Sequence, residues 1–361
     1  MLVSLLVYRF IQYSSVSYPM TTPFHLFSLP YLPLKQVLDN IGPETLIILS
    51  LCSLRSKSIV VSYRGPSKNV QLKLHFGSKG SLEGSYGSGE SIRTYMQLTV
   101  EQTGKLTMDE TLETVRIGSF EKVPVKMDYN FMKGKHIKTY WEDRMTGLAA
   151  IGDYGREIFN RDIYEVRIGE KQAEDDHRRA AEWVKNSQGT IQSLNCNFKP
   201  KVNEDLDFIL ENFNYTKQLC LSVEPSEHYS PAELPNFQID TLDVFYGFWI
   251  EQEHLLKMNC KTVTLCYSKL TNQDCNVFLK HWLAGGCSKV KDLSVGVSEL
   301  IDYQIVFDGV DFVERESDLE RVFVDDDGTD YTIMGGFDVK QSNVTATITR
   351  QSSSHFWMIV W

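Results

Sequence analysis

The chain has 361 residues, of which 42% are hydrophobic, so it is long enough to form two or three domains that each bury a core. Its formal net charge of −10 has the wrong sign for a protein that binds nucleic acid through phosphate contacts, and we expect no nucleic-acid partner. The apolar runs are all shorter than a membrane-spanning helix requires, so we also expect no membrane association.

The N-terminal residues carry little structural patterning. Leu2 to Val7 is apolar, but it is short, follows no basic region and precedes no small-residue cleavage site, so it is a poor signal peptide. Met20 leads directly into the first patterned helix. We therefore expect residues 1–23 to be a disordered extension, with Met20 rather than Met1 as the natural start.

Residues 24–63 are patterned as short helices. After Leu29-Pro30, apolar residues recur on one helical face, and Gly42-Pro43 ends that helix and opens the next. The second helix is apolar around most of its circumference from Leu46 to Leu54. Such a helix is typical of one that packs on its own domain on one side and on a partner on the other.

This stretch resembles an F-box, the helical module that docks a protein onto the Skp adaptor of a cullin ubiquitin ligase. The resemblance implies that the module binds the adaptor through Leu29, Pro30, Leu34, Val37, Leu38, Ile41, Leu46, Leu49, Ser50, Cys52 and Arg55. The alternative is a helical hairpin that merely belongs to the core, because short motifs produce false matches.

Residues 64–145 predict a small β-rich linker domain. Four segments between Val70 and Tyr129 alternate apolar and polar side chains, which favours an antiparallel sheet. The Gly/Ser-rich piece from Gly77 to Ser91 predicts a long loop between strands. Its glycine spacing imitates a phosphate-binding loop, but Glu90 stands where the phosphate-contacting lysine belongs, so we expect no nucleotide there.

Residues 146–361 predict a repetitive βα domain. Near its start, Asp175 to Arg179 is dense in charge, and we interpret this helix start, including His177, as a solvated surface rather than a catalytic site. Five strand-like segments then follow at intervals of 25, 23, 21 and 30 residues, with helical patterns between them. We take these residues as equivalent: Leu194, Leu219, Leu242, Val263 and Leu293.

A strand and a helix that recur at this interval indicate an irregular leucine-rich-repeat-like array of parallel strands. The tail from Arg321 to Trp361 returns to strands, with Asp327-Gly328 as the turn of a hairpin. The predicted fold class is therefore α+β / α/β, with an N-terminal helical F-box, a small β-rich middle segment and a C-terminal βα array that ends in a hairpin.

The repeat region carries a set of apolar and aromatic positions with interspersed polar residues: Trp249-Ile250, Leu255-Leu256, Met258-Asn259-Cys260, Leu270-Thr271, Asn276, Phe278-Leu279-Lys280 and Trp282. In these residues it is similar to the F-box-associated type 2 domain, which follows the F-box in a large nematode family. The resemblance implies that the C-terminal domain recognises a substrate protein, and it supplies no catalytic residues. Trp249 and Trp282 lie in amphipathic patterns, so we interpret both as core anchors rather than ligand contacts.

The sequence offers little that points to catalysis. The seven cysteines are scattered without a CxxC pair, which fits free thiols in a reducing compartment rather than disulfides or a zinc site. Nucleophile elbows, HExxH motifs and dinucleotide fingerprints are absent from the sequence. We expect no cofactor and no metal, and a protein of the cytoplasm or nucleus that is not an enzyme.

The leading hypothesis is an F-box adaptor that binds the Skp subunit, and through it a cullin, and presents an unknown target protein for ubiquitination. A repeat-fold interaction protein that does not engage a ligase is the alternative, and a hydrolase with an unfamiliar site is a more distant one. In such solenoids the strand-lined surface commonly binds the partner. The candidate target-binding residues are Gln218, Ser222, Asp243, Thr264 and Asp292, although a solvated sheet face is the favoured explanation of their alternation.

Overall fold

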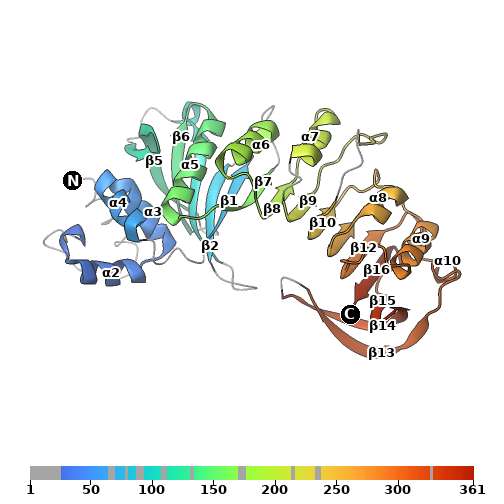
Figure 1. Cartoon of the computed structure of the whole chain (residues 1–361). Helices are drawn as coiled ribbons and strands as arrows, with labels where there is room; N and C mark the ends of the chain where they lie inside the picture. The colour runs from blue at the N-terminus through green and yellow to red at the C-terminus, as the bar shows by residue number, and fades with distance from the viewer. Residues whose placement is uncertain are drawn as a thin grey trace. The chain divides into compact units, whose positions relative to one another are not determined.

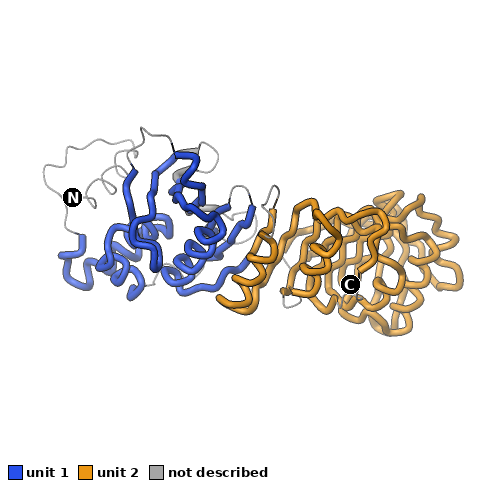
Figure 2. The backbone as a smooth tube through the Cα atoms, turned by 90° about the horizontal axis from the view of Figure 1, so that it is seen from above, with its two compact units in different colours: residues 1–165 blue, residues 166–361 orange. Residues whose placement is uncertain are grey.

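In the computed structural model, the described residues are 26–63, 70–77, 80–86, 93–106, 112–130, 134–169, 176–212, 216–231, 237–325 and 328–361. The predicted extension at residues 1–23 and the start at Met20 lie outside these ranges. The chain divides into two compact units, residues 1–165 and 166–361, which Figure 2 colours separately.

Unit 1 opens with a helical module, which we define as α2 (Tyr31–Asn40), α3 (Pro43–Cys52) and α4 (Leu54–Tyr63), preceded by the 3-10 turn η1 (Leu26–Ser28). As predicted, Pro43 stands in the first turn of α3, and Gly42 before it is extended. Helix α3 contacts α4 and also the strands β3 (Arg93–Gln102) and β4 (Glu113–Ile117). The module thus shares a core with the sheet that follows it.

The sheet of unit 1 also contains β1 (Gln71–Phe76), β2 (Ser81–Tyr86), β5 (Phe120–Asn130) and β6 (Gly134–Trp141), in the order β1-β2-β3-β6-β5-β4. The short turn η4 (Thr103–Lys105) follows β3. Most neighbours are antiparallel, but β3 and β6 are parallel, so the prediction of an antiparallel sheet is wrong for this pair. The hairpin of β4 and β5 intervenes in the sequence, and β6 then returns beside β3 in the same direction.

Strand β2 corrects the prediction of a loop from Gly77 to Ser91. Its residues pair with β1 on one side and β3 on the other, and Leu82 is fully buried. Gly84 sits opposite Leu72 in the ladder, although glycine disfavours strands intrinsically. Pairing on both sides outweighs that local preference, which a single-sequence pattern does not reveal. The rest of the predicted loop, apart from Gly77 and Gly80, lies outside the described residues.

Helix α5 (Arg144–Phe159) was not predicted, and it belongs to unit 1, which extends to residue 165. It buries Leu148, Ile151 and Tyr154 and contacts β1, β2, β3 and β6. Three glycines lower its helix propensity, which hides it from pattern reading. At Gly147 the helix approaches the Trp141 ring so closely that an added Cβ would lie 2.5 Å from it.

Unit 2 contains a ladder of short strands. Strand β7 (Ile163–Ile168) straddles the division, and β8 (Ser193–Cys196), β9 (Gln218–Leu221), β10 (Thr241–Val244), β11 (Thr262–Leu265) and β12 (Asp292–Gly296) follow in chain order. Strands β8 to β12 are parallel, as predicted. The predicted equivalence is also confirmed, because Leu194, Leu219, Leu242, Val263 and Leu293 are register partners and all are buried.

Helices connect these strands on one side of the ladder (Figure 1). They are α6 (Asp176–Ser187), α7 (Glu204–Asn212), α8 (Gln252–Lys257), α9 (Asn272–Leu283) and the short α10 (Tyr303–Val306). Helix α9 begins with a capping box between Thr271 and Asp274. Trp249 and Trp282 are 4% and 1% exposed, which confirms that both are core residues.

Four antiparallel strands complete unit 2: β13 (Val313–Val324), β14 (Asp330–Gln341), β15 (Val344–Ile348) and β16 (His355–Val360). Strand β16 pairs with β12 and reverses the strand direction there. Strands β13 and β14 form a long hairpin, which curves along the side of unit 2 opposite to the helices (Figure 1). Gly328, between these strands, has φ +83°, a value that favours glycine, and Asp327 of the predicted Asp-Gly turn lies outside the described residues.

The start of α6 differs from the prediction of a solvated surface. Asp176 and His177 are only 1% and 4% exposed. His177 Nε2 lies 3.0 Å from Asp205 Oδ1, and its ring stacks on Phe198. The prediction is wrong here because α7 and the segment after β8 cover this turn, and those contacts are not encoded in the charge pattern of α6 itself.

Candidate protein-binding surfaces

The eleven predicted adaptor-binding residues differ in how deeply they are buried. The buried ones are Leu38, Leu46, Leu49 and Ser50; the half-buried ones are Leu29, Leu34, Val37, Ile41 and Cys52; the exposed ones are Pro30 and Arg55. The four buried side chains support the module from inside. Direct contact with an adaptor remains a prediction for the other seven.

Ser50 ties the helical module to the rest of unit 1. Its hydroxyl donates to the carbonyl of Ile47 at 2.7 Å and accepts from the Tyr154 hydroxyl at 2.8 Å. Burial raises the pKa of Tyr154 far above its ordinary value, so the phenol stays neutral and remains a donor. The Lys57 ammonium on α4 lies over the Tyr154 ring and pairs with Glu157 at 2.7 Å. These contacts hold α3 and α4 against α5.

Large apolar side chains remain exposed on the same module. Tyr31 and Leu32 in the first turn of α2 are 70% and 69% exposed, next to the exposed Pro30 and Pro33. Leu54, at the start of α4, is 59% exposed. Consecutive exposed apolar residues are unusual on a surface that meets only water, and they favour a protein-binding role for the start of α2.

The predicted target-binding residues lie together on one side of the unit 2 ladder. We define the polar face as two register rows, Gln218, Thr241, Thr262 and Asp292, followed by Cys220, Asp243, Thr264 and Ser294. All eight are half-buried and alternate with fully buried residues. Ser222 lies just beyond β9, where its N–H donates to the carbonyl of Cys196. The structure therefore brings together the five candidates, which are far apart in sequence.

Among the residues that the structure describes, two carboxylates on the polar face form no ion pair. Asp243 accepts only a weak hydrogen bond from the thiol of Cys220, at 3.8 Å, and Asp292 accepts from the indole N–H of Trp357 at 2.8 Å. Burial raises the pKa of both aspartates. For Asp292, the negative charge of Asp325 beside the hairpin turn adds to the increase. Both carboxylates therefore lack a compensating positive charge.

An aromatic cluster at the end of the polar face was not predicted. It consists of Phe245 and Tyr246 after β10 and Tyr267 after β11. The Phe245 and Tyr267 rings meet edge to face at 5.0 Å, and Tyr246 stacks on Tyr267 at 6.1 Å. Tyr267 has φ +46° and is 66% exposed, and Phe245 is 41% exposed. The sequence signal was an aromatic residue two positions after the end of two consecutive strands.

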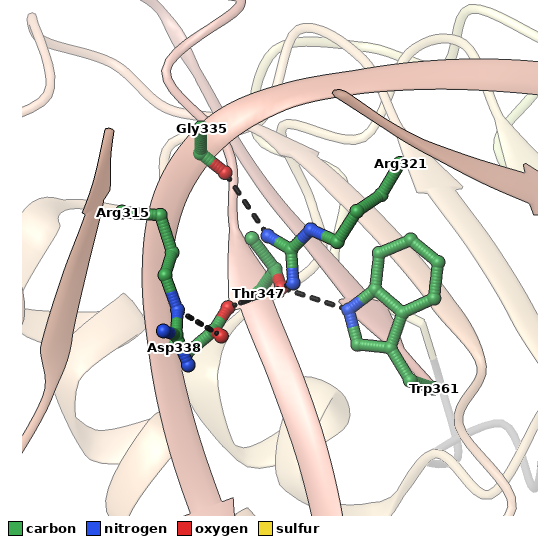
Figure 3. A network of polar contacts seen from close by, with 6 residues as sticks. All are labelled: Arg315, Arg321, Gly335, Asp338, Thr347 and Trp361. Carbon is green, nitrogen blue, oxygen red and sulfur yellow. Dashed lines mark hydrogen bonds and ion pairs between the residues drawn. The ribbon is translucent and has the colours of Figure 1, made fainter. Parts of the chain in front are cut away.

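The C-terminal hairpin is held by a buried carboxylate (Figure 3). Asp338 accepts from Arg315 Nε at 2.6 Å, from Arg321 at 3.1 Å and from the Thr347 hydroxyl at 2.6 Å. The Arg321 guanidinium also covers the Trp361 ring. Burial alone would raise the pKa of Asp338, but the hydrogen bonds from Thr347 and the two arginines lower it below its usual value. The network positions the hairpin that carries Asp325.

All seven cysteines are free thiols; Cys196, Cys260, Cys275 and Cys287 are buried core residues, and the other three are half-buried. Burial raises the pKa of Cys260 to about 11 and that of Cys275 to about 12, which suppresses the reactive thiolate. Within the described residues, His, Cys, Asp and Glu side chains do not gather into a group that could hold a metal ion. Nor does that part of the chain contain a helix of the length and apolar character needed to cross a membrane.

The comparisons with known proteins point to the second unit. Residues 233–295 match the family model described as F-box associated. This segment of unit 2 is therefore similar to an F-box-associated domain. The matched segment includes β10, β11 and β12, and with them Asp243, Asp292 and the aromatic cluster. It also contains every residue on which the predicted resemblance was based.

One relative is the Skn-1 dependent zygotic transcript 15 protein of Caenorhabditis elegans, which is 25% identical over 315 residues. The alignment covers 81% of this chain and 85% of the relative. No solved structure gave a significant match. The domain and the nematode relative together confirm the predicted resemblance to nematode proteins with an F-box-associated domain.

Proposed function

We propose that this chain is the substrate-recognition adaptor of an F-box ubiquitin ligase. The helical module binds the Skp adaptor, and through it a cullin, while unit 2 binds a target protein. The F-box-associated domain carries the proposal, because it supports an F-box type of protein with a substrate-binding role. The exposed Tyr31 and Leu32, inside the segment that resembles an F-box, add a surface suited to the adaptor.

In this role the chain performs no chemistry itself. It holds the target near the ubiquitin-charged enzyme and so raises the effective concentration of the target there. The high thiol pKa values agree with a binding protein rather than an enzyme that uses a cysteine nucleophile.

Co-purification with the Skp adaptor tests the proposal. The wild-type chain should form a stable complex, and two double variants should lose it: Leu29→Ala/Pro30→Ala, and Tyr31→Ala/Leu32→Ala. Tyr31 and Leu32 are about 70% exposed, so their removal should leave the fold intact. Leu300→Ala removes a side chain that is 73% exposed in unit 2, and it serves as the matched control.

A folded wild-type chain that does not bind the adaptor would refute the ligase role. Equal binding by wild type and both double variants would show that the adaptor contacts another surface. If the wild-type chain does not bind the adaptor, the remaining interpretation is an interaction protein whose unit 2 binds a partner without a ligase.

A further inference from the structure

We infer that the polar face and the aromatic cluster of unit 2 bind an extended segment of a target protein through an arginine of that segment. The inference rests on the target-binding part of the proposed function and adds the chemistry of the target. Two observations within the F-box-associated domain carry it: uncompensated carboxylates and exposed aromatic rings beside one of them.

The two carboxylates, Asp243 and Asp292, favour a partner with a positive charge. Half-buried carboxylates are commonly paired with a cation, because burial without compensation costs free energy. Within the described ranges, the side-chain donors to Asp243 and Asp292 are neutral, a thiol and an indole N–H. Three lysines stand immediately before strands of the ladder: Lys217, Lys261 and Lys291. Each is an even number of residues from the buried positions of its strand, so these lysines do not belong to the polar face.

The aromatic cluster defines the type of cation. Phe245 lies two residues beyond Asp243 on the same strand side, which is about 7 Å along an extended chain. Tyr267, packed against Phe245, presents most of its surface to solvent. A planar guanidinium can stack on an aromatic ring and also donate to a carboxylate, whereas an ammonium ion lacks the planar surface for stacking. Arginine therefore fits this pair of features better than lysine.

The strand geometry favours an extended occupant. The two rows of the polar face run across β9 to β12, whose neighbours lie about 4.8 Å apart. The row positions offer hydroxyl, amide and thiol groups: Gln218, Cys220, Thr241, Thr262, Thr264 and Ser294. An extended segment laid across the strands can place one arginine at Asp243 and a second basic residue toward Asp292, near Asp325.

The test uses the full chain and a labelled peptide of alternating serine and arginine as the probe, with binding followed by fluorescence anisotropy at physiological salt. Asp243→Asn and Tyr267→Ala should each weaken binding about tenfold. Asp311→Asn removes the same charge at an exposed position of unit 2 and should change binding less than twofold. The same peptide with lysine should bind more weakly than the arginine probe.

Thiol alkylation locates the probe independently. Cys220 and Cys266 are half-buried on this side of unit 2, and the half-buried Cys52 in unit 1 is the internal control. The probe should protect Cys220 and Cys266 from iodoacetamide and leave Cys52 unchanged, as measured by mass spectrometry. The inference fails if all three variants weaken binding equally, or if the probe protects none of the cysteines or all alike.

The peptide-binding test can be decided independently of the ligase proposal. Asp243→Asn should still co-purify with the Skp adaptor, because Asp243 belongs to unit 2 and the helical module to unit 1. A wild-type chain that binds the arginine probe at this face but not the Skp adaptor would refute the ligase role and support the present inference.

Discussion

Removal of the Asp338 carboxylate should destabilise unit 2 strongly. Asp338 is 4% exposed and accepts three side-chain hydrogen bonds, two of them from arginines. Asp338→Ala would leave the fully buried Thr347 hydroxyl without its acceptor, and both guanidiniums without their counter-charge. Breaking a buried pair costs about 3–5 kcal/mol. The arginine side chains are 38% and 21% exposed, so water compensates part of this. We expect a loss of about 2–4 kcal/mol.

Urea unfolding followed by near-UV circular dichroism measures this loss. Asp330→Ala is the matched control, because Asp330 is an exposed carboxylate on the same strand. Its free energy of unfolding should change by less than about 0.5 kcal/mol. Asp338→Asn should fall between the two, since the amide oxygen still accepts a hydrogen bond while the charge is lost. If Asp338→Ala cost no more than Asp330→Ala, the network would not stabilise the hairpin.

Three further predictions concern acid stability and the packing of unit 1. The folded pKa of Asp338 lies below its unfolded value, so its contribution to stability is complete above about pH 4 and should be lost as the pH falls through the folded pKa. Asp338→Asn should abolish that component of an acid titration of unfolding, and an unchanged titration would contradict the assignment. Tyr154→Phe removes the hydrogen bond to Ser50 and should cost about 1 kcal/mol in urea unfolding, with Ser50 still bonded to Ile47; no change would mean that this hydrogen bond adds nothing. Gly147→Ala should cost about 1–2 kcal/mol in thermal or urea unfolding, because overlap with the buried Trp141 ring outweighs the gain in helix propensity. A more stable Gly147→Ala variant would show that Trp141 moves freely.

The repeat register was accessible from sequence because each strand encodes it locally. Leu219, Leu242 and Val263 each alternate with the residues on either side of them along the strand. A shift of the strand register by one residue would move these buried side chains to the other face of the sheet, so the alternation fixes the register. The boundary between α2 and α3 was accessible for a similar reason, since Gly42-Pro43 restricts its own backbone whatever surrounds it. The end of α3 at Cys52 was not, because the apolar run predicted one helix through Leu54, where α4 instead begins after the extended Ser53.

Other features depended on contacts between distant residues. Strand β2 and helix α5 contain glycines that oppose their local structure, and only packing on neighbouring elements stabilises them. His177 is buried because α7 supplies Asp205 and Phe208, which lie in a different helix.

The two proposed surfaces also depend partly on local sequence patterns and partly on tertiary structure. The sequence by itself determined a helical module resembling an F-box, an F-box-associated repeat and the alternation that places Asp243 and Asp292 on one face. Only the tertiary structure decided that Ser50 points inward to Tyr154, that Tyr31 and Leu32 stay exposed, and that the Phe245 and Tyr267 rings meet. Local patterns fix which side of a strand or helix a residue occupies, whereas burial, pairing and the proximity of separate strands arise from the packing of the whole unit.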